Sequence, residues 1–170
     1  MTRLLTEGFE MQDLVNYGRG HTDWPWPGGE PSISTSIKRS GRASGVIGHD
    51  SWLIMLFADS SEIYIRTGIY IFGNMDDTSE TATILWLGND NDEDLGYIKI
   101  SLYKIEIYVG GALKATGVTT LTSNTWYLLE IYVKIADSGT ITVRINGMED
   151  STWSGDTKPG SNAIIGSLMF

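Results

Sequence analysis

A regular alternation of apolar and polar residues over 126–135 is the feature that most constrains the fold of this chain. Every second residue from Tyr127 to Ile135 is apolar or aromatic, and the residues between them include Glu130 and Lys134. A period of two is typical of a β-strand with one buried and one exposed face. The segment is therefore predicted to be a strand at the surface of a hydrophobic core.

Two turn signals follow this strand. Residues 136–139 read Ala-Asp-Ser-Gly, a composition that favours a tight turn. The alternation resumes over 141–145, and Asn146-Gly147 then gives the dipeptide that most favours a two-residue β-hairpin. Residues 124–153 are thus predicted to form two antiparallel strands and the beginning of a third.

The rest of the chain reads as short strands, because no long stretch carries a 3.6-residue period without glycine or β-branched interruptions. Further strands are predicted at residues 4–11, 32–38, 51–58, 62–72, 81–87, 97–103, 106–109, 113–115 and 163–170. Gly110-Gly111 is a candidate for a second two-residue hairpin. Residues 1–170 are expected to form a single all-β domain, a two-sheet antiparallel sandwich. Its first and last strands are expected to pair with each other, which would hide two edges.

Two segments carry a resemblance to a known family. The order Trp126-Tyr-Leu-Leu-Glu, hairpin and Val143-Arg-Ile-Asn-Gly resembles the concanavalin A-like jelly roll of the laminin-G and pentraxin type, where a Trp opens one strand and Asn-Gly ends the next. The opening residues 3–10, RLLTEGFE, resemble the start of such domains in tailed-phage structural proteins. The resemblance implies a jelly-roll sandwich and a role in a virion.

Charge and composition exclude several partners. The formal net charge of −9 disfavours nucleic acid and anionic membranes, which bind clustered Lys and Arg. The chain has no Cys, so disulfides and thiolate chemistry are ruled out. Glu7, Glu10 and Asp13 stand where a signal peptide needs an apolar run, so we expect a virion protein assembled in the host cytoplasm and not secreted by a signal peptide.

Paired carboxylates, which glycoside hydrolysis requires, are not apparent in the sequence. Glu62, Glu106 and Glu130 each stand alone on their predicted strands. The related glucanase pattern Glu-x-Asp-x-x-Glu would begin at Glu130, but Tyr132 and Ile135 replace its second and third acids. The protein is therefore predicted not to be an enzyme.

An acidic segment offers alternating oxygen ligands at Asp90, Asp92 and Asp94. It is not an EF-hand, because Leu95 and Ser101 stand where that loop needs Gly and Glu. Two interpretations stay open: a Ca²⁺ site in a loop, or a charged turn that opposes aggregation. No cofactor is predicted to be required.

The segment 24–29 places Trp24 and Trp26 two residues apart in a Pro- and Gly-rich loop. These side chains could pack against an end of the sandwich, anchor a partner protein or stack on a sugar. They are the first candidates for a binding site.

Two functions from different classes are carried forward. The first is a non-enzymatic structural protein of a tailed phage, either a capsid decoration protein or a tail-associated module. It is expected to bind the major capsid or tail protein and to form a homo-oligomer. Repeated copies on the particle would multiply its affinity. The second is a lectin-like carbohydrate-binding module for host-surface recognition. One sandwich fold can serve either role.

The virion hypothesis predicts that purified phage particles contain this chain. Quantitative mass spectrometry should give a copy number that is a simple fraction of the major capsid protein for a decoration protein, or a few copies for a tail module. Absence of the chain from intact particles would remove the hypothesis.

Overall fold

Almost every residue that the structure describes lies in a β-strand or in a turn between strands. The computed structural model describes residues 32–34, 36, 44–46, 54–71, 81–88, 94–158 and 165–169. No helix in these ranges is long and apolar enough to cross a membrane.

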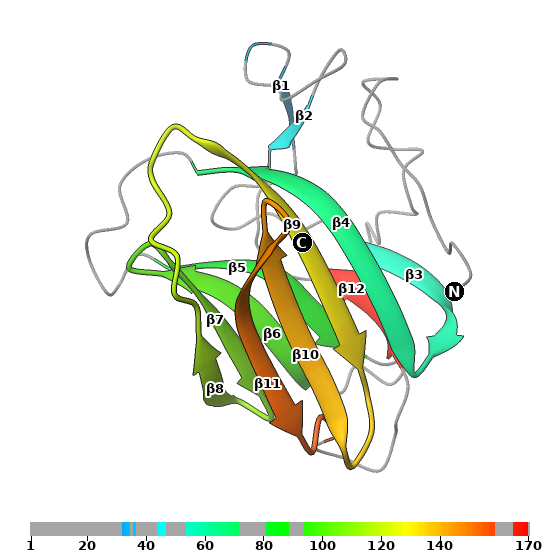
Figure 1. Cartoon of the computed structure of the whole chain (residues 1–170). Coiled ribbons are helices and arrows are strands. Elements are labelled where there is room, and N and C mark those ends of the chain that lie inside the picture. The colour runs from blue at the N-terminus through cyan, green and yellow to red at the C-terminus, as the bar shows by residue number, and fades with distance from the viewer. Residues whose placement is uncertain are drawn as a thin grey trace.

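The strands form two packed sheets (Figure 1). The smaller sheet has the order β11 (Met148–Gly155), β10 (Gly139–Ile145), β9 (Trp126–Lys134) and β4 (Glu62–Tyr70). The larger has the order β3 (Ile54–Ser60), β12 (Ile165–Met169), β5 (Thr81–Gly88), β6 (Asp94–Ser101), β7 (Lys104–Val109) and β8 (Ala112–Thr116). All paired strands run antiparallel, so the predicted all-β jelly-roll sandwich is confirmed.

A separate short ladder joins β1 (Ser32–Ser34) to β2 (Ser44–Val46), again antiparallel. It accounts for the first part of the strand that the sequence predicts over 32–38. The predicted opening strand, residues 4–11, lies outside the described residues.

The closing strand β12 has different neighbours from those expected. It lies between β3 and β5 and pairs with both. A strand has only two hydrogen-bonding edges, so the predicted pairing of residues 163–170 with residues 4–11 is wrong. The sequence showed that both segments are apolar, but it did not show which strands would reach them.

The hairpin turns form where the sequence places them. Gly110 and Gly111 have φ of 56° and 73°, and Asn146 and Gly147 have φ of 52° and 86°. Two successive positive φ angles are the conformation of a type I′ turn, which Gly and Asn adopt at low cost. Both turns match the right-handed twist of the strands they connect and so set the register of β7–β8 and β10–β11.

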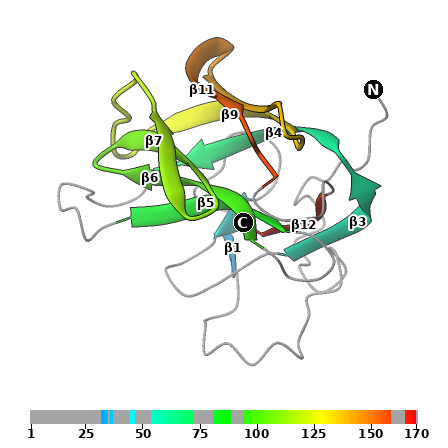
Figure 2. The same cartoon turned by 90° about the horizontal axis from the view of Figure 1, so that it is seen from below.

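Two layers enclose the core (Figure 2). The small sheet contributes Leu129, Ile131 and Val143, and the large sheet contributes Ile98 and Ile107, all at most 1% exposed. Burying a side chain of this kind stabilises the fold by about 1.5–3 kcal/mol. The alternation seen over 126–135 therefore forms one wall of this core.

The chain passes between the two sheets four times, and two of these crossings lie wholly within the described residues. At one edge a single residue, Ser61, separates β3 from β4, and the Ser60 hydroxyl donates a hydrogen bond of 2.7 Å to the Glu62 carbonyl. At the other edge the segment 117–125 leads from β8 to β9. There the Asp150 carboxylate of β11 accepts a 2.7 Å hydrogen bond from the Thr119 N–H.

Asp150 is buried beside this second crossing, with 6% of its surface exposed. Its carbonyl also accepts the Val118 N–H at 3.3 Å. Gly117 lies so close to the Asp150 carboxylate that a Cβ at this position would overlap it. The Asp150 carboxylate and the Asp150 carbonyl, each of which accepts one main-chain N–H, thus tie the edge of the small sheet to the connection from the large one.

Thr157 holds the turn between β9 and β10. Its side chain is fully buried, and its hydroxyl lies 2.8 Å from the Lys134 carbonyl, 3.1 Å from the Ala136 carbonyl and 2.9 Å from the Ala136 N–H, which donates to it. One hydroxyl therefore satisfies main-chain groups of a turn that lies between two core strands.

Replacement Thr157→Val keeps the side-chain shape and removes this hydroxyl. Buried main-chain groups would lose their partner, so the free energy of unfolding should fall by about 1–3 kcal/mol. Urea denaturation measures the change. The control Thr140→Val removes a hydroxyl that bonds only the exposed Ser154 hydroxyl at 3.1 Å, and it should shift stability by no more than about 0.5 kcal/mol. Equal effects would contradict the assigned role of Thr157.

Candidate functional site

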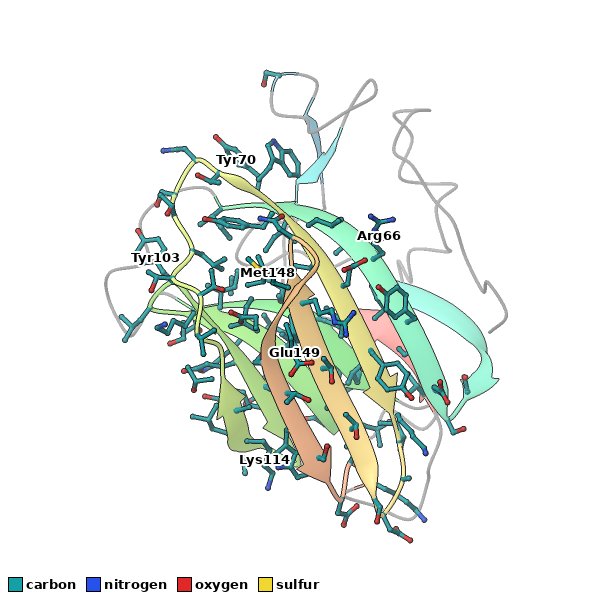
Figure 3. All side chains as sticks on the ribbon, in the orientation of Figure 1. Arg66, Tyr70, Tyr103, Lys114, Met148 and Glu149 are labelled. Carbon is teal, nitrogen blue, oxygen red and sulfur yellow. The ribbon has the colours of Figure 1, made fainter. Side chains whose placement is uncertain are left out.

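The outer surface of the small sheet carries ordered rows of polar and aromatic side chains, which we call the front face (Figure 3). Three rows cross the strands in the order β4, β9, β10, β11. The aromatic row is Tyr64, Tyr132, Thr142 and Thr152; the charged row is Arg66, Glu130, Arg144 and Glu149; the end row is Glu62, Lys134, Thr140 and Ser154. Antiparallel register sets these neighbours, since directly opposed residues lie on the same side of a sheet.

The charged row is built around Glu130 on the central strand β9. Glu130 is opposite Arg66 of β4 and opposite Arg144 of β10. The Arg66 Nε lies 3.5 Å from the Glu130 Oε1, and their side chains are 64% and 17% exposed. The carboxylate is therefore largely covered, while the guanidinium of Arg66 stands in solvent. An exposed ion pair of this kind adds little stability, about 0–1 kcal/mol.

Tyr64 adjoins this charged row. Burial, a hydrogen bond to the Glu130 carboxylate and the negative charge of Glu130 raise the pKa of the Tyr64 phenol, while Arg66 and Arg144 act in the opposite sense. A raised pKa keeps the phenol protonated at neutral pH. Tyr64 can therefore donate a hydrogen bond or a proton but is a poor base.

Tyr132 is the neighbour of Tyr64 in the aromatic row. Burial and a hydrogen bond to Glu62 raise the pKa of its phenol. Beyond it, the Thr142 and Thr152 hydroxyls lie 2.9 Å apart. The row therefore presents two phenol rings followed by two hydroxyls, with Tyr64 45% exposed.

A second aromatic pair lies farther along the same two strands. Tyr70 of β4 is opposite Trp126 of β9, with ring centroids 5.3 Å apart at an interplanar angle of 52°. Both side chains are partly exposed. Aromatic rings thus occur at more than one position along the β4–β9 pair.

The outer surface of the large sheet is different. Tyr97 and Tyr108 stack with centroids 4.6 Å apart at 12°, and the Lys99 Nζ lies 4.7 Å from the centroid of the Tyr108 ring. The Tyr108 hydroxyl donates to Glu106 at 3.0 Å, and Glu106 also pairs with Lys99 at 3.6 Å. These ring faces are occupied by their neighbours, so this surface is less suited to stacking on a ligand.

The candidates drawn from the sequence are placed only in part. Trp24, Trp26, Asp90 and Asp92 lie outside the described residues. Asp94 begins β6, where burial raises the pKa of its carboxyl, while hydrogen bonding to the Gly96 main chain and the Trp86 side chain acts in the opposite sense. Within the described ranges no group of three or more His, Cys, Asp or Glu could hold a metal. The Ca²⁺ site over 90–94 stays a prediction, since two of its three acids are not described.

The sequence did not reveal the charged row. Glu130 was treated as an isolated carboxylate, whereas the structure places it among Arg66, Arg144 and Tyr64. The alternation of β4 and β9 could have shown that these side chains point outward. Their pairing depends on β4 lying beside β9, and these strands are far apart in the sequence.

Comparison with known proteins finds similarity in the fold but not in the sequence. No family model matches the chain, and no curated protein matches it. Solved structures do match, and the one described next aligns with most of this two-sheet β-sandwich.

One of these structures is the endo-β-1,4-glucuronan lyase of the fungus Trichoderma reesei. It aligns with a TM-score of 0.60 at 10% sequence identity, covering 89% of this chain and 79% of that chain. Likeness at this identity shows the fold alone.

This match corrects the prediction that the protein is not an enzyme. That prediction rested on the lack of the paired carboxylates that hydrolysis needs. The fold is shared with a lyase, an enzyme that cleaves by elimination and not by hydrolysis. A missing carboxylate pair therefore does not exclude catalysis on this fold, and the prediction is wrong as it was drawn.

The geometry around Tyr64 predicts how its pKa responds to charge. In Glu130→Gln the pKa of Tyr64 should fall, because the hydrogen-bonded negative charge is removed. In Arg66→Gln it should rise, because a nearby positive charge is lost. NMR titration of ¹³C-labelled tyrosine, assigned with Tyr64→Phe, measures both shifts. An unchanged Tyr64 pKa in Glu130→Gln would contradict the described contact.

Proposed function

We propose that this protein binds a polysaccharide on the front face of its small sheet. The observation that carries the proposal is the aromatic row, in which Tyr64 and Tyr132 lie side by side and lead to the hydroxyls of Thr142 and Thr152. Sugar rings combine apolar C–H faces with hydroxyl groups. Tyrosine offers both an apolar ring and a hydroxyl, so it suits such ligands.

The arrangement supports an extended ligand. The aromatic row crosses four strands, and the Tyr70–Trp126 pair adds rings farther along β4 and β9. A chain of sugars can contact several such positions at once, and each contact adds to the affinity. Individual sugar contacts are weak, so a surface with several contact positions suits a polymer better than a single small molecule.

The structural comparison supports the same class of ligand. The glucuronan lyase that shares this fold acts, by its name, on a polysaccharide. At 10% identity this likeness lends support only to the class, and the residues of the front face carry the rest.

The tailed-phage setting stays a separate prediction about where the protein acts. It rests on the resemblance of residues 3–10 and 126–147. A polysaccharide-binding face suits a host-recognition module on such a particle. Binding to the major capsid or tail protein and homo-oligomer formation are part of this prediction, and the copy number in particles decides it.

Affinity electrophoresis through a panel of neutral and acidic polysaccharides tests the proposal. At least one polysaccharide should retard the protein, and Tyr64→Ala should weaken that binding roughly tenfold, the cost of losing one central aromatic contact. The control Tyr97→Ala removes a tyrosine from the opposite surface and should leave binding unchanged. Retardation by no polysaccharide, or equal losses in both variants, would contradict the proposal.

A further inference from the structure

We infer that the front face binds an uncharged polysaccharide and discriminates against polyuronates. This inference rests on the proposed function and names the ligand chemistry of the same site. It separates the chain from the lyase with which it shares a fold, whose name gives a glucuronan, a polymer of glucuronic acid, as its substrate.

The charges of the front face are paired strand by strand. Lys134 of β9 is opposite Glu62 of β4, and Arg66 of β4 is opposite Glu130 of β9. The remaining cation, Arg144 of β10, lies between Glu130 and Glu149. Three cations thus face three carboxylates, and the rows carry no net charge.

A polyanion needs an excess of positive charge, because binding it means neutralising its charges with Lys or Arg. The front face offers none. The formal net charge of −9 for the whole chain adds repulsion at longer range. A polyuronate carries one carboxylate on every sugar, so each added sugar would meet the same unfavourable field.

Glu130 stands in the way of a sugar carboxylate at Arg66, with which it is ion-paired, and it lies opposite Arg144. It is in the centre of the row, its side chain is 17% exposed, and its Oε1 lies 3.5 Å from the Arg66 Nε. A sugar carboxylate that paired with Arg66 would compete with Glu130 and leave two negative charges side by side. Like charges so close are costly to hold.

An uncharged sugar meets no such competition. The Thr142–Thr152 pair at 2.9 Å and the Thr140–Ser154 pair at 3.1 Å offer hydroxyls that both donate and accept. Tyr64 adds a phenol that stays protonated. The hydroxyl groups of a neutral glycan can exchange hydrogen bonds with these groups without displacing an ion pair.

The test compares matched ligands. Soluble β-1,4-glucan, β-1,4-mannan and β-1,4-galactan oligosaccharides are each paired with the same sugar chain after oxidation of its primary hydroxyls to carboxylates. Isothermal titration of the full chain against each pair gives two affinities. We expect a neutral member to bind at least about tenfold more tightly than its oxidised partner, with little dependence on salt.

Glu130→Gln provides the specific variant. Removing this carboxylate frees Arg66 from its ion pair and leaves Arg144 without the carboxylate opposite it on β9, so affinity for the oxidised chain should rise by roughly tenfold and become salt-dependent. Glu106→Gln is the matched control, because Glu106 is also ion-paired, is 16% exposed and lies on the opposite surface. It makes the same change in net charge and should leave affinity for the oxidised chain near that of the unmodified protein.

Three results decide between the claims. Tighter, salt-sensitive binding of an oxidised chain by the unmodified protein would overturn the inference and leave the proposed function standing. Equal gains in Glu130→Gln and Glu106→Gln would also overturn it, because net charge and not the charged row would then set the preference. Binding of neither member of any pair would overturn the proposed function itself and the inference with it.

Discussion

The pairing of β9 with β4 on one side and β10 on the other is the constraint on which the rest of the structure depends. Alternate side chains of β9 enter the core, where Leu129, Ile131 and Val133 are at most 1% exposed. The residues between them form the middle of the front face. The same backbone hydrogen bonds therefore fix both the hydrophobic core and the positions of Glu130 and Tyr132. A slip of one residue would exchange the two sets of side chains, so burial of the core holds the front face in register.

The ends of the small sheet depend on polar contacts as well as on the burial of Leu121 and Ile135. The Thr157 hydroxyl forms hydrogen bonds with main-chain groups of the turn that follows β9. Asp150 accepts hydrogen bonds from main-chain N–H groups of the segment that precedes β9. Buried polar groups are costly unless they are paired, so these contacts leave few alternatives for how the chain enters and leaves β9. The outer surface of the large sheet is closed by its own contacts, since Tyr97, Lys99, Tyr108 and Glu106 bind one another.

Local features of the sequence predicted much of the fold. The alternation over 126–135, the Asn146-Gly147 hairpin and the Gly110-Gly111 hairpin all depend on neighbouring residues, and all are confirmed. Contacts between distant segments were not predicted correctly. The closing strand β12 pairs with β3 and β5, and Arg66 pairs with Glu130, because of strand order in the sheets. Alternation shows which way a side chain points but not which strand lies beside it.

The central claim is that a polysaccharide occupies the front face. Amide and side-chain NMR shifts of labelled protein, followed during titration with a neutral oligosaccharide that binds, test it most directly. The account predicts that Tyr64, Tyr132 and Thr142 shift with the ligand while Tyr97 and Tyr108, on the opposite surface, do not. Shifts confined to the outer surface of β6 and β7 would contradict it.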